Sequence, residues 1–134
     1  MILADTSAWV EYDRATGSPA DQRMSGLIET EGPIAVTEPV LMEVLAGART
    51  DKLEADLRRL MLRFKLLRFD IAADFDGAVR IYRRCRGRGV TPRGIVDCMI
   101  ASVAWRHGAT LLANDADLTR VARVVGIELD PASG

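Results

Sequence analysis

Two apolar segments of this sequence end in an aspartate, and that pattern is where chemistry is expected. Asp5 follows the apolar residues 1–4, and Asp115 closes the segment "TLLAND". In open parallel sheets, ligands bind beyond the carboxyl ends of the strands, and neighbouring strands lie about 4.8 Å apart. Two unpaired carboxylates at that spacing repel, so the site must protonate one acid, supply a protein cation or bind a metal ion.

Three further acidic residues extend this set. Asp117 lies two residues beyond Asp115, Asp97 lies in the first turn of the segment "GIVDCMIASVAW", and Glu43 lies within "LMEVLAG". Each acid taken singly has an ordinary explanation as a helix cap, a partner of the helix dipole or half of an ion pair. Together they predict one acidic pocket, because strand ends and helix starts gather at one edge of such a sheet.

The residue types in this pocket favour a hard divalent cation. Carboxylate oxygens suit Mg²⁺ or Mn²⁺, whereas Zn²⁺ is usually held by Cys or His. Cys85 and Cys98 have neither metal-ligand spacing nor enough partners for a disulfide framework. His107, the single histidine, ends a predicted helix, where a capping or dipole role is expected. Water activated by a metal ion is then the simplest nucleophile.

Short apolar runs alternate with amphipathic segments, which predicts an α/β fold with a mostly parallel sheet. Strands are expected at residues 1–4, 33–37, 65–69 and 109–115, with a last edge strand at 127–130. Helices are expected at residues 7–14, 19–31, 38–48, 51–64, 70–89, 91–108 and 116–126. A chain of 134 residues fits one domain, residues 1–134, with a frayed tail at 130–134.

Composition bounds the class of protein. The chain is 49% hydrophobic with a net charge of −1, and no apolar run approaches the ~20 residues that span a bilayer. No signal peptide is evident, and the sparse cysteines fit a cytoplasmic location. Charge is unevenly distributed: thirteen Lys or Arg stand against six Asp or Glu between Arg49 and Arg93. A basic surface beside an acidic pocket is what a phosphodiester substrate requires.

The sequence resembles the PIN-domain ribonucleases, and most closely the toxins of bacterial VapBC toxin–antitoxin pairs. The matching segments are "ILADTSAWVEY", "EPVLMEVLAGA" and "RGIVDCMIASVAWRHGATLLANDADLTRVA", and they cover essentially the whole chain. The resemblance implies a single PIN-like domain with a five-stranded sheet of order 3-2-1-4-5 flanked by helices. That order places the two strands that end in aspartate side by side.

The resemblance also implies the site and the activity. The family's acidic site maps onto Asp5, Glu43, Asp97 and Asp115, with Asp117 as a fifth, supporting acid. We expect Asp5, Asp97, Asp115 and Asp117 to make up a Mg²⁺ or Mn²⁺ site, with Asp117 tuning its outer part, and Glu43 to orient or deprotonate the attacking water. Ser7 and Arg93 match the supporting residues of the family.

Two positions depart from the family pattern. Ala113 stands where Thr is frequent, and Leu118 stands where Phe is frequent. The first change removes one expected hydrogen bond near the metal, and the second is a conservative core change. Neither removes an acid. The implied protein is a metal-dependent endoribonuclease that cleaves structured RNA such as tRNA, forms a homodimer and binds a VapB-like antitoxin.

Two features keep alternatives open. Basic residues are expected to hold the phosphates of the RNA, and Arg93 lies closest in sequence to the acids. Two further groups either bind RNA or form solvated faces. They are Arg83, Arg84, Arg86 and Arg88, and Arg58, Arg59 and Arg63. The stretch "LEADLRRLMLRFKLLRF" is either a packed core helix or a groove for an antitoxin helix. Its large apolar residues are Leu57, Leu60, Met61, Phe64 and Leu67.

Three other functions compete with a nuclease. A phosphatase of the haloacid-dehalogenase type needs a second Asp two residues after the first, and that position is Ser7. Such a phosphatase and a phosphoacceptor receiver domain both need a Lys near the acids, and none is well placed. A non-catalytic RNA-binding PIN module would keep the fold, but the presence of all five acids argues against it.

Overall fold

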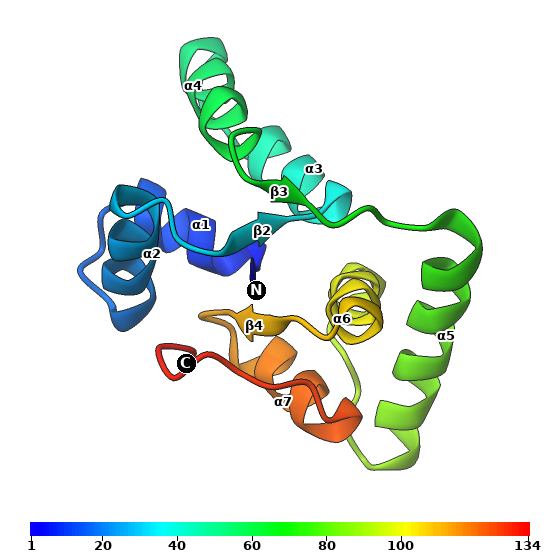
Figure 1. Ribbon diagram of the computed structural model, residues 1–134. Coiled ribbons are helices and arrows are strands. Elements are labelled where there is room, and N and C mark those ends of the chain that lie inside the picture. Colours follow the sequence, from blue (N-terminus) through cyan, green and yellow to red (C-terminus); the bar gives the residue numbers. More distant parts are fainter.

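The computed structural model describes residues 1–134 and shows strands alternating with helices along the chain (Figure 1). The helices bury apolar side chains against a small central sheet, as the alternation predicts. None of the helices combines the length and the apolarity needed to cross a membrane. The elements are β1 (Ile2–Ala4), α1 (Thr6–Asp13), α2 (Pro19–Glu29), β2 (Ile34–Val36), α3 (Glu38–Ala46), α4 (Asp51–Met61), β3 (Lys65–Leu66), α5 (Ile71–Gly87), α6 (Ile95–His107), β4 (Thr110–Leu112) and α7 (Ala116–Val125).

The sheet has four parallel strands in the order β3-β2-β1-β4. This confirms the predicted order for the first four strands and places β1 beside β4. The expected fifth strand is reduced to one parallel bridge between Leu111 and Leu129. Residues 127–130 therefore occupy the fifth position of the sheet without forming a regular strand.

The C-terminal tail differs from the frayed end that was expected. Asp130 is buried, and its backbone N–H donates to the Leu111 carbonyl at 2.8 Å. The Gly134 N–H donates to the Ala113 carbonyl at 3.0 Å, and the Ser133 hydroxyl accepts from the Ala113 N–H at 3.1 Å. The tail thus satisfies backbone groups that the edge of β4 would otherwise leave to water.

Local sequence signals explain where most helices start and stop. Ser18 caps α2 by accepting from the Asp21 N–H at 3.1 Å, with Pro19 in the first turn, as predicted. Gly108 ends α6 in the left-handed conformation, at φ 62°. Helix α6 begins at Ile95, later than the expected start at residue 91, and its N-cap is Gly94, which is extended. Pro92 disfavours helical geometry in Thr91 alone. Arg93 consequently lies in a loop.

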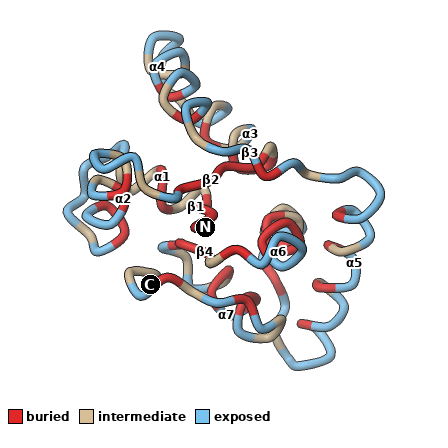
Figure 2. The backbone as a smooth tube through the Cα atoms, viewed as in Figure 1, coloured by how far each residue is buried: buried red, intermediate tan, exposed pale blue.

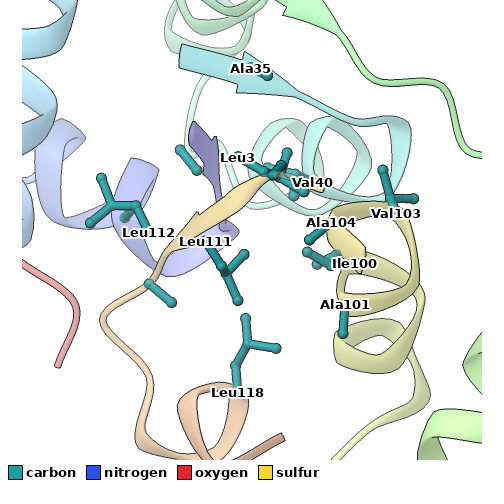
Figure 3. Close-up of a cluster of buried hydrophobic side chains, with 14 of the residues drawn as sticks. Leu3, Ala35, Val40, Ile100, Ala101, Val103, Ala104, Leu111, Leu112 and Leu118 are labelled. Carbon is teal, nitrogen blue, oxygen red and sulfur yellow. The ribbon is translucent and has the colours of Figure 1, made fainter. Parts of the chain in front are cut away.

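The buried residues that form the core gather on the strands and on the helices around them (Figure 2). All three residues of β1 and of β2 are buried, so these strands are covered on both faces. On β4, Leu111 and Leu112 point to opposite sides of the sheet, and Leu111 faces Leu118 of α7 (Figure 3). Leu118 is fully buried, so this departure from the family pattern fits the core.

A buried polar cluster joins α5 to α6. Asp74 is fully buried and accepts hydrogen bonds from the Ser102 hydroxyl at 2.8 Å and from the Arg106 guanidinium at 2.7 and 3.1 Å. Arg106 also donates to the Arg68 carbonyl at 2.7 Å. Gly77 lies so close to Ser102 that a Cβ atom at this position would overlap the Ser102 hydroxyl. These contacts hold the helix that carries Asp97 against its neighbour.

Candidate active site

The four principal acids predicted from the sequence line one open cleft of about 480 Å³ at the carboxyl ends of β1 and β4. The acids are Asp5, Glu43, Asp97 and Asp115. Asp5 follows β1, Glu43 lies on α3, Asp97 lies in the first turn of α6, and Asp115 precedes α7. Residues that are far apart along the chain are therefore brought to the same edge of the sheet.

The strand register differs from a simple face-to-face pair of aspartates. Ala4 pairs with Leu112, and the Asp5 N–H donates to the Leu112 carbonyl at 2.9 Å, so Ala113 is level with Asp5. Asp115 comes two residues later and reaches the cleft as the N-cap of α7. The two carboxylates share the cleft without facing each other directly across one strand spacing.

Asp5 is a helix cap and a buried acid at the same time. Its Oδ2 accepts from the Ser7 N–H at 3.0 Å and from the Ser7 hydroxyl at 2.6 Å, which caps α1. Its Oδ1 is buried without a hydrogen-bond partner. Burial raises the pKa of Asp5 from its ordinary value of 3.8 to about 6, against the lowering effect of the Ser7 hydrogen bonds. The cap alone does not explain an orphaned carboxylate oxygen.

Hydrogen bonds orient the side chains around Asp5 and Glu43. The Thr6 hydroxyl donates to Glu43 Oε1 at 2.6 Å and so joins α1 to α3. The Ser7 hydroxyl, which donates to Asp5, accepts from the Asn114 N–H at 2.8 Å. Ser7 therefore links the end of β1 to the loop after β4, and this is the observed form of its supporting role.

Asp97 carries the largest electrostatic perturbation among the acids of the cleft. Burial and the surrounding negative charges raise the pKa of Asp97 from 3.8 to about 7. Desolvation is the largest cause, and Asp5, Asp115, Glu43 and Asp117 follow in that order. The cleft therefore lacks enough positive charge for Asp97 to ionise as readily as an ordinary aspartate.

One protein cation, Arg93, reaches the acids that line the cleft, whereas Asp117 outside it also pairs with Arg120 at 3.5 Å. The Arg93 guanidinium donates to Asp115 Oδ2 at 2.9 Å, and the Arg93 backbone N–H donates to Asp117 Oδ2 at 2.8 Å. Asp115 Oδ1 meanwhile caps α7 through the Asp117 N–H at 2.9 Å. Asp117 does not line the cleft itself, and it positions the loop that carries Arg93. The Arg93 side chain is 72% exposed, so its charge only partly offsets the acids.

The donor set of this cleft fits a hard divalent cation. It consists of carboxylate, hydroxyl and amide oxygens, and the buried Asp5 Oδ1 has no partner in the protein. No three of the His, Cys, Asp and Glu side chains stand in an arrangement that would hold a metal ion as they are. Mg²⁺ keeps several of its waters and needs only one or two direct carboxylate ligands. A loosely arranged group of acids with a missing counter-charge is compatible with that mode of binding.

Sequence reasoning missed three polar residues of the cleft. Thr6 and Glu11 lie on α1, and Asn114 lies between Ala113 and Asp115. Ser7 and Glu11 are four residues apart on one helix, so the helical period could have placed Glu11 on the same face. Thr6 gave no such signal, because its partner Glu43 is distant in the sequence.

Comparisons with known proteins identify the family. The PIN domain family matches residues 2–124. Ribonuclease VapC11 of Mycobacterium tuberculosis is 46% identical over 129 residues, which cover 96% of this chain and 96% of the relative. Ribonuclease VapC51 of the same organism is 32% identical over 128 residues, covering 92% of this chain and 87% of the relative.

A solved structure supports the same fold. VapBC2 from Rickettsia felis, bound to a DNA fragment from its promoter, superposes with a TM-score of 0.75 at 20% identity, covering 97% of this chain and 98% of that chain. At that level of identity the structural likeness shows the fold alone, whereas the family match and the VapC relatives extend over almost the whole sequence. The chain belongs to the PIN-domain family, in its VapC group.

Proposed function

We propose that this protein is a Mg²⁺- or Mn²⁺-dependent endoribonuclease, the toxin of a type II toxin–antitoxin pair, and that it cleaves a structured RNA such as tRNA. The supporting observation is the set of four acids in one cleft with an unpartnered Asp5 oxygen and a raised Asp97 pKa. The names of the relatives, VapC ribonucleases, favour RNA as the substrate.

Each residue of the cleft has a task under this proposal. Asp5, Asp97 and Asp115 would hold the ion directly or through water, and Asp117 would support them through the Arg93 loop. A bound divalent ion supplies a water of lowered pKa and stabilises charge on the leaving oxygen. Glu43, which the Thr6 hydroxyl orients, would orient or deprotonate the attacking water.

A cleavage assay on total RNA tests this function. We expect cuts at discrete positions with Mg²⁺ or Mn²⁺, no cuts with EDTA, and loss of cutting in Asp97→Asn. The matched control is Asp56→Asn, which alters an exposed aspartate on α4 that pairs with Lys52 at 2.9 Å. Release of phosphate from a generic phosphomonoester without RNA cleavage would support a phosphatase instead and contradict the proposal.

We propose further that a VapB-like antitoxin occupies a groove of about 490 Å³ between α1, α3 and α4. Trp9, Val44 and Leu57 contribute its apolar lining, and Val10 and Glu43 line both this groove and the acidic cleft. A segment lying in the groove would reach the cleft, where an arginine of the antitoxin could neutralise the acids. Co-expression of the antitoxin should abolish cleavage, and a Leu53→Asp change in the groove lining should relieve that inhibition.

The packing of the stretch that begins with α4 limits the groove proposed for the antitoxin. Leu57, Met61 and Leu67 are buried, and Leu60 and Phe64 pack against the core, so the stretch is mainly a packed core segment. Only its first part contributes to the groove, through Leu53 and Leu57. The surface that we propose for the antitoxin is therefore smaller than the apolar content of the sequence suggests.

We propose that the protein forms a homodimer through α5. Ile71, Phe75 and Val79, spaced four residues apart, are 74%, 52% and 50% exposed and form one apolar stripe. Asp76 and Arg80 form an ion pair beside the stripe at 2.8 Å, and antiparallel pairing of two α5 helices would let these charges exchange partners. Phe75→Lys should convert the dimer to a monomer in light scattering, and an unchanged mass would contradict this interface.

A further inference from the structure

The arginines that the sequence leaves as candidates for RNA binding fall into two classes in the structure. Arg58, Arg59 and Arg63, on α4 and just after it, each form an ion pair with an acidic side chain, at 2.6, 3.3 and 3.4 Å. Their charges are already directed at carboxylates of the protein. They therefore form the solvated face that such helices usually present.

The arginines at the end of α5 are different. Arg83, Arg84, Arg86 and Arg88, here called the α5 arginine cluster, are all exposed, and none has an ion pair or a side-chain hydrogen bond within the protein. The helix dipole favours cations at this end. Like charges three or four residues apart nevertheless repel one another, and an external anion would remove that repulsion.

A short loop connects the cluster to the acidic cleft. Gly89, at φ 78°, turns the chain after α5, and the Val90 N–H closes the turn on the Cys85 carbonyl at 2.9 Å. The chain then reaches Arg93, which contacts Asp115 and Asp117. Arg88 and Arg93 are five residues apart, so their Cα atoms are separated by no more than about 18 Å. Helix α5 also packs against α6 and α7, which begin at the cleft.

We propose that the α5 arginine cluster is the surface that holds the phosphate backbone of the RNA beside the cleft, with Arg93 between the two. This inference rests on the proposed ribonuclease function. Arginine binds phosphate oxygens in a bidentate manner, and four such groups can follow a strand. Aromatic residues make up 5% of the chain, which favours contacts to the backbone over stacking of bases.

A charge-matched pair of variants tests the proposal. Arg84→Gln/Arg88→Gln removes two charges from the cluster, and Arg59→Gln/Arg63→Gln removes two paired charges near α4, so both change the net charge equally. Binding to bulk tRNA is measured by fluorescence anisotropy at several salt concentrations, in an Asp97→Asn background that prevents cleavage. We expect the first variant to bind about tenfold more weakly, with a salt slope reduced by about 1.5. The second should change affinity less than twofold.

The outcomes separate this inference from the function on which it rests. If both variants lose the same affinity for RNA, only the overall charge of the protein matters. If neither variant loses affinity, the cluster does not touch RNA. Either result overturns the proposal. Arg83→Gln/Arg86→Gln repeats the test should the first variant fail to fold. A wild-type protein that does not cleave RNA would contradict the proposed function, while the binding comparison would still decide which arginines hold RNA.

Discussion

Replacing Asp5 with asparagine separates its two roles, as a helix cap and as an ionised acid of the cleft. Asparagine keeps the shape of the side chain and is as good an N-cap as aspartate. Its carbonyl oxygen can still accept from Ser7, as Asp5 Oδ2 does. The substitution therefore removes the charge and leaves the cap in place.

The magnitude follows from the raised pKa of Asp5. Burial moves this pKa from 3.8 to about 6, so the folded protein holds the proton more tightly than the unfolded chain. The corresponding stability is fully present below pH 3.8 and is lost as the pH rises through 6. Since one pKa unit corresponds to 1.36 kcal/mol, the raised pKa of Asp5 costs the metal-free protein about 3 kcal/mol at pH 8, where Asp5 is ionised. It costs roughly half of that at pH 5, where Asp5 ionises readily only in the unfolded chain.

Urea unfolding in EDTA at pH 5 and pH 8 measures this cost. We expect Asp5→Asn to be more stable than the wild type, by up to about 3 kcal/mol at pH 8 and by less at pH 5, while RNA cleavage is lost. Asp56→Asn serves as a control of opposite sign, because Lys52 lowers the pKa of Asp56. If Asp5→Asn unfolds at the same urea concentration as the wild type at both pH values, the reasoning is refuted and Asp5 acts as a cap alone.

Three further predictions concern the cleft and the helices behind it. Because the pKa of Asp97 is raised to about 7, Mn²⁺ affinity should increase between pH 6 and pH 8, and Mn²⁺ binding should release protons. Titration calorimetry in buffers of different ionisation enthalpy measures both effects, and an affinity that does not change with pH would contradict the prediction. Gly77→Ala should displace the Ser102 hydroxyl from Asp74 and cost about 1–3 kcal/mol in urea unfolding, whereas Gly26→Ala, with open space around it, should cost nothing. Arg106→Leu should leave Asp74 buried without its cation and cost about 3 kcal/mol, more than Ser102→Ala; equal costs would show that the charge is unimportant.

The helices, the strands and the acids of the cleft could be predicted from the sequence. The positions of these acids relative to one another could be predicted less well. Apolar runs ending in Asp5 and Asp115 marked the two strands whose ends meet, because parallel strands share a carboxyl edge. The register of those strands was not predictable, since β1 and β4 have three residues each, nearly all buried, and carry no alternation that distinguishes one register from the next. The strand order itself came from the resemblance to the family.

Long-range polar contacts were beyond sequence reasoning. The Thr6–Glu43 hydrogen bond and the contact between Ser133 and Ala113 join residues whose separation has no local signature. The ion pairs within α4 are different, because Glu54 and Arg58 stand four residues apart, a spacing that predicts a pair on one helix face. The arginines at the end of α5 have no acidic residue three or four positions away, so the same spacing rule predicts that they lack such partners.

The attachment of the tail to β4 has a consequence for how this protein meets other chains. The outer side of β4 is occupied by residues 128–134, so it has no row of free amides and carbonyls for an incoming strand. The opposite border of the sheet is β3, which offers only Lys65 and Leu66, too short a template for strand addition. Recognition by a partner must therefore proceed through side chains on helices and loops rather than by extension of the sheet.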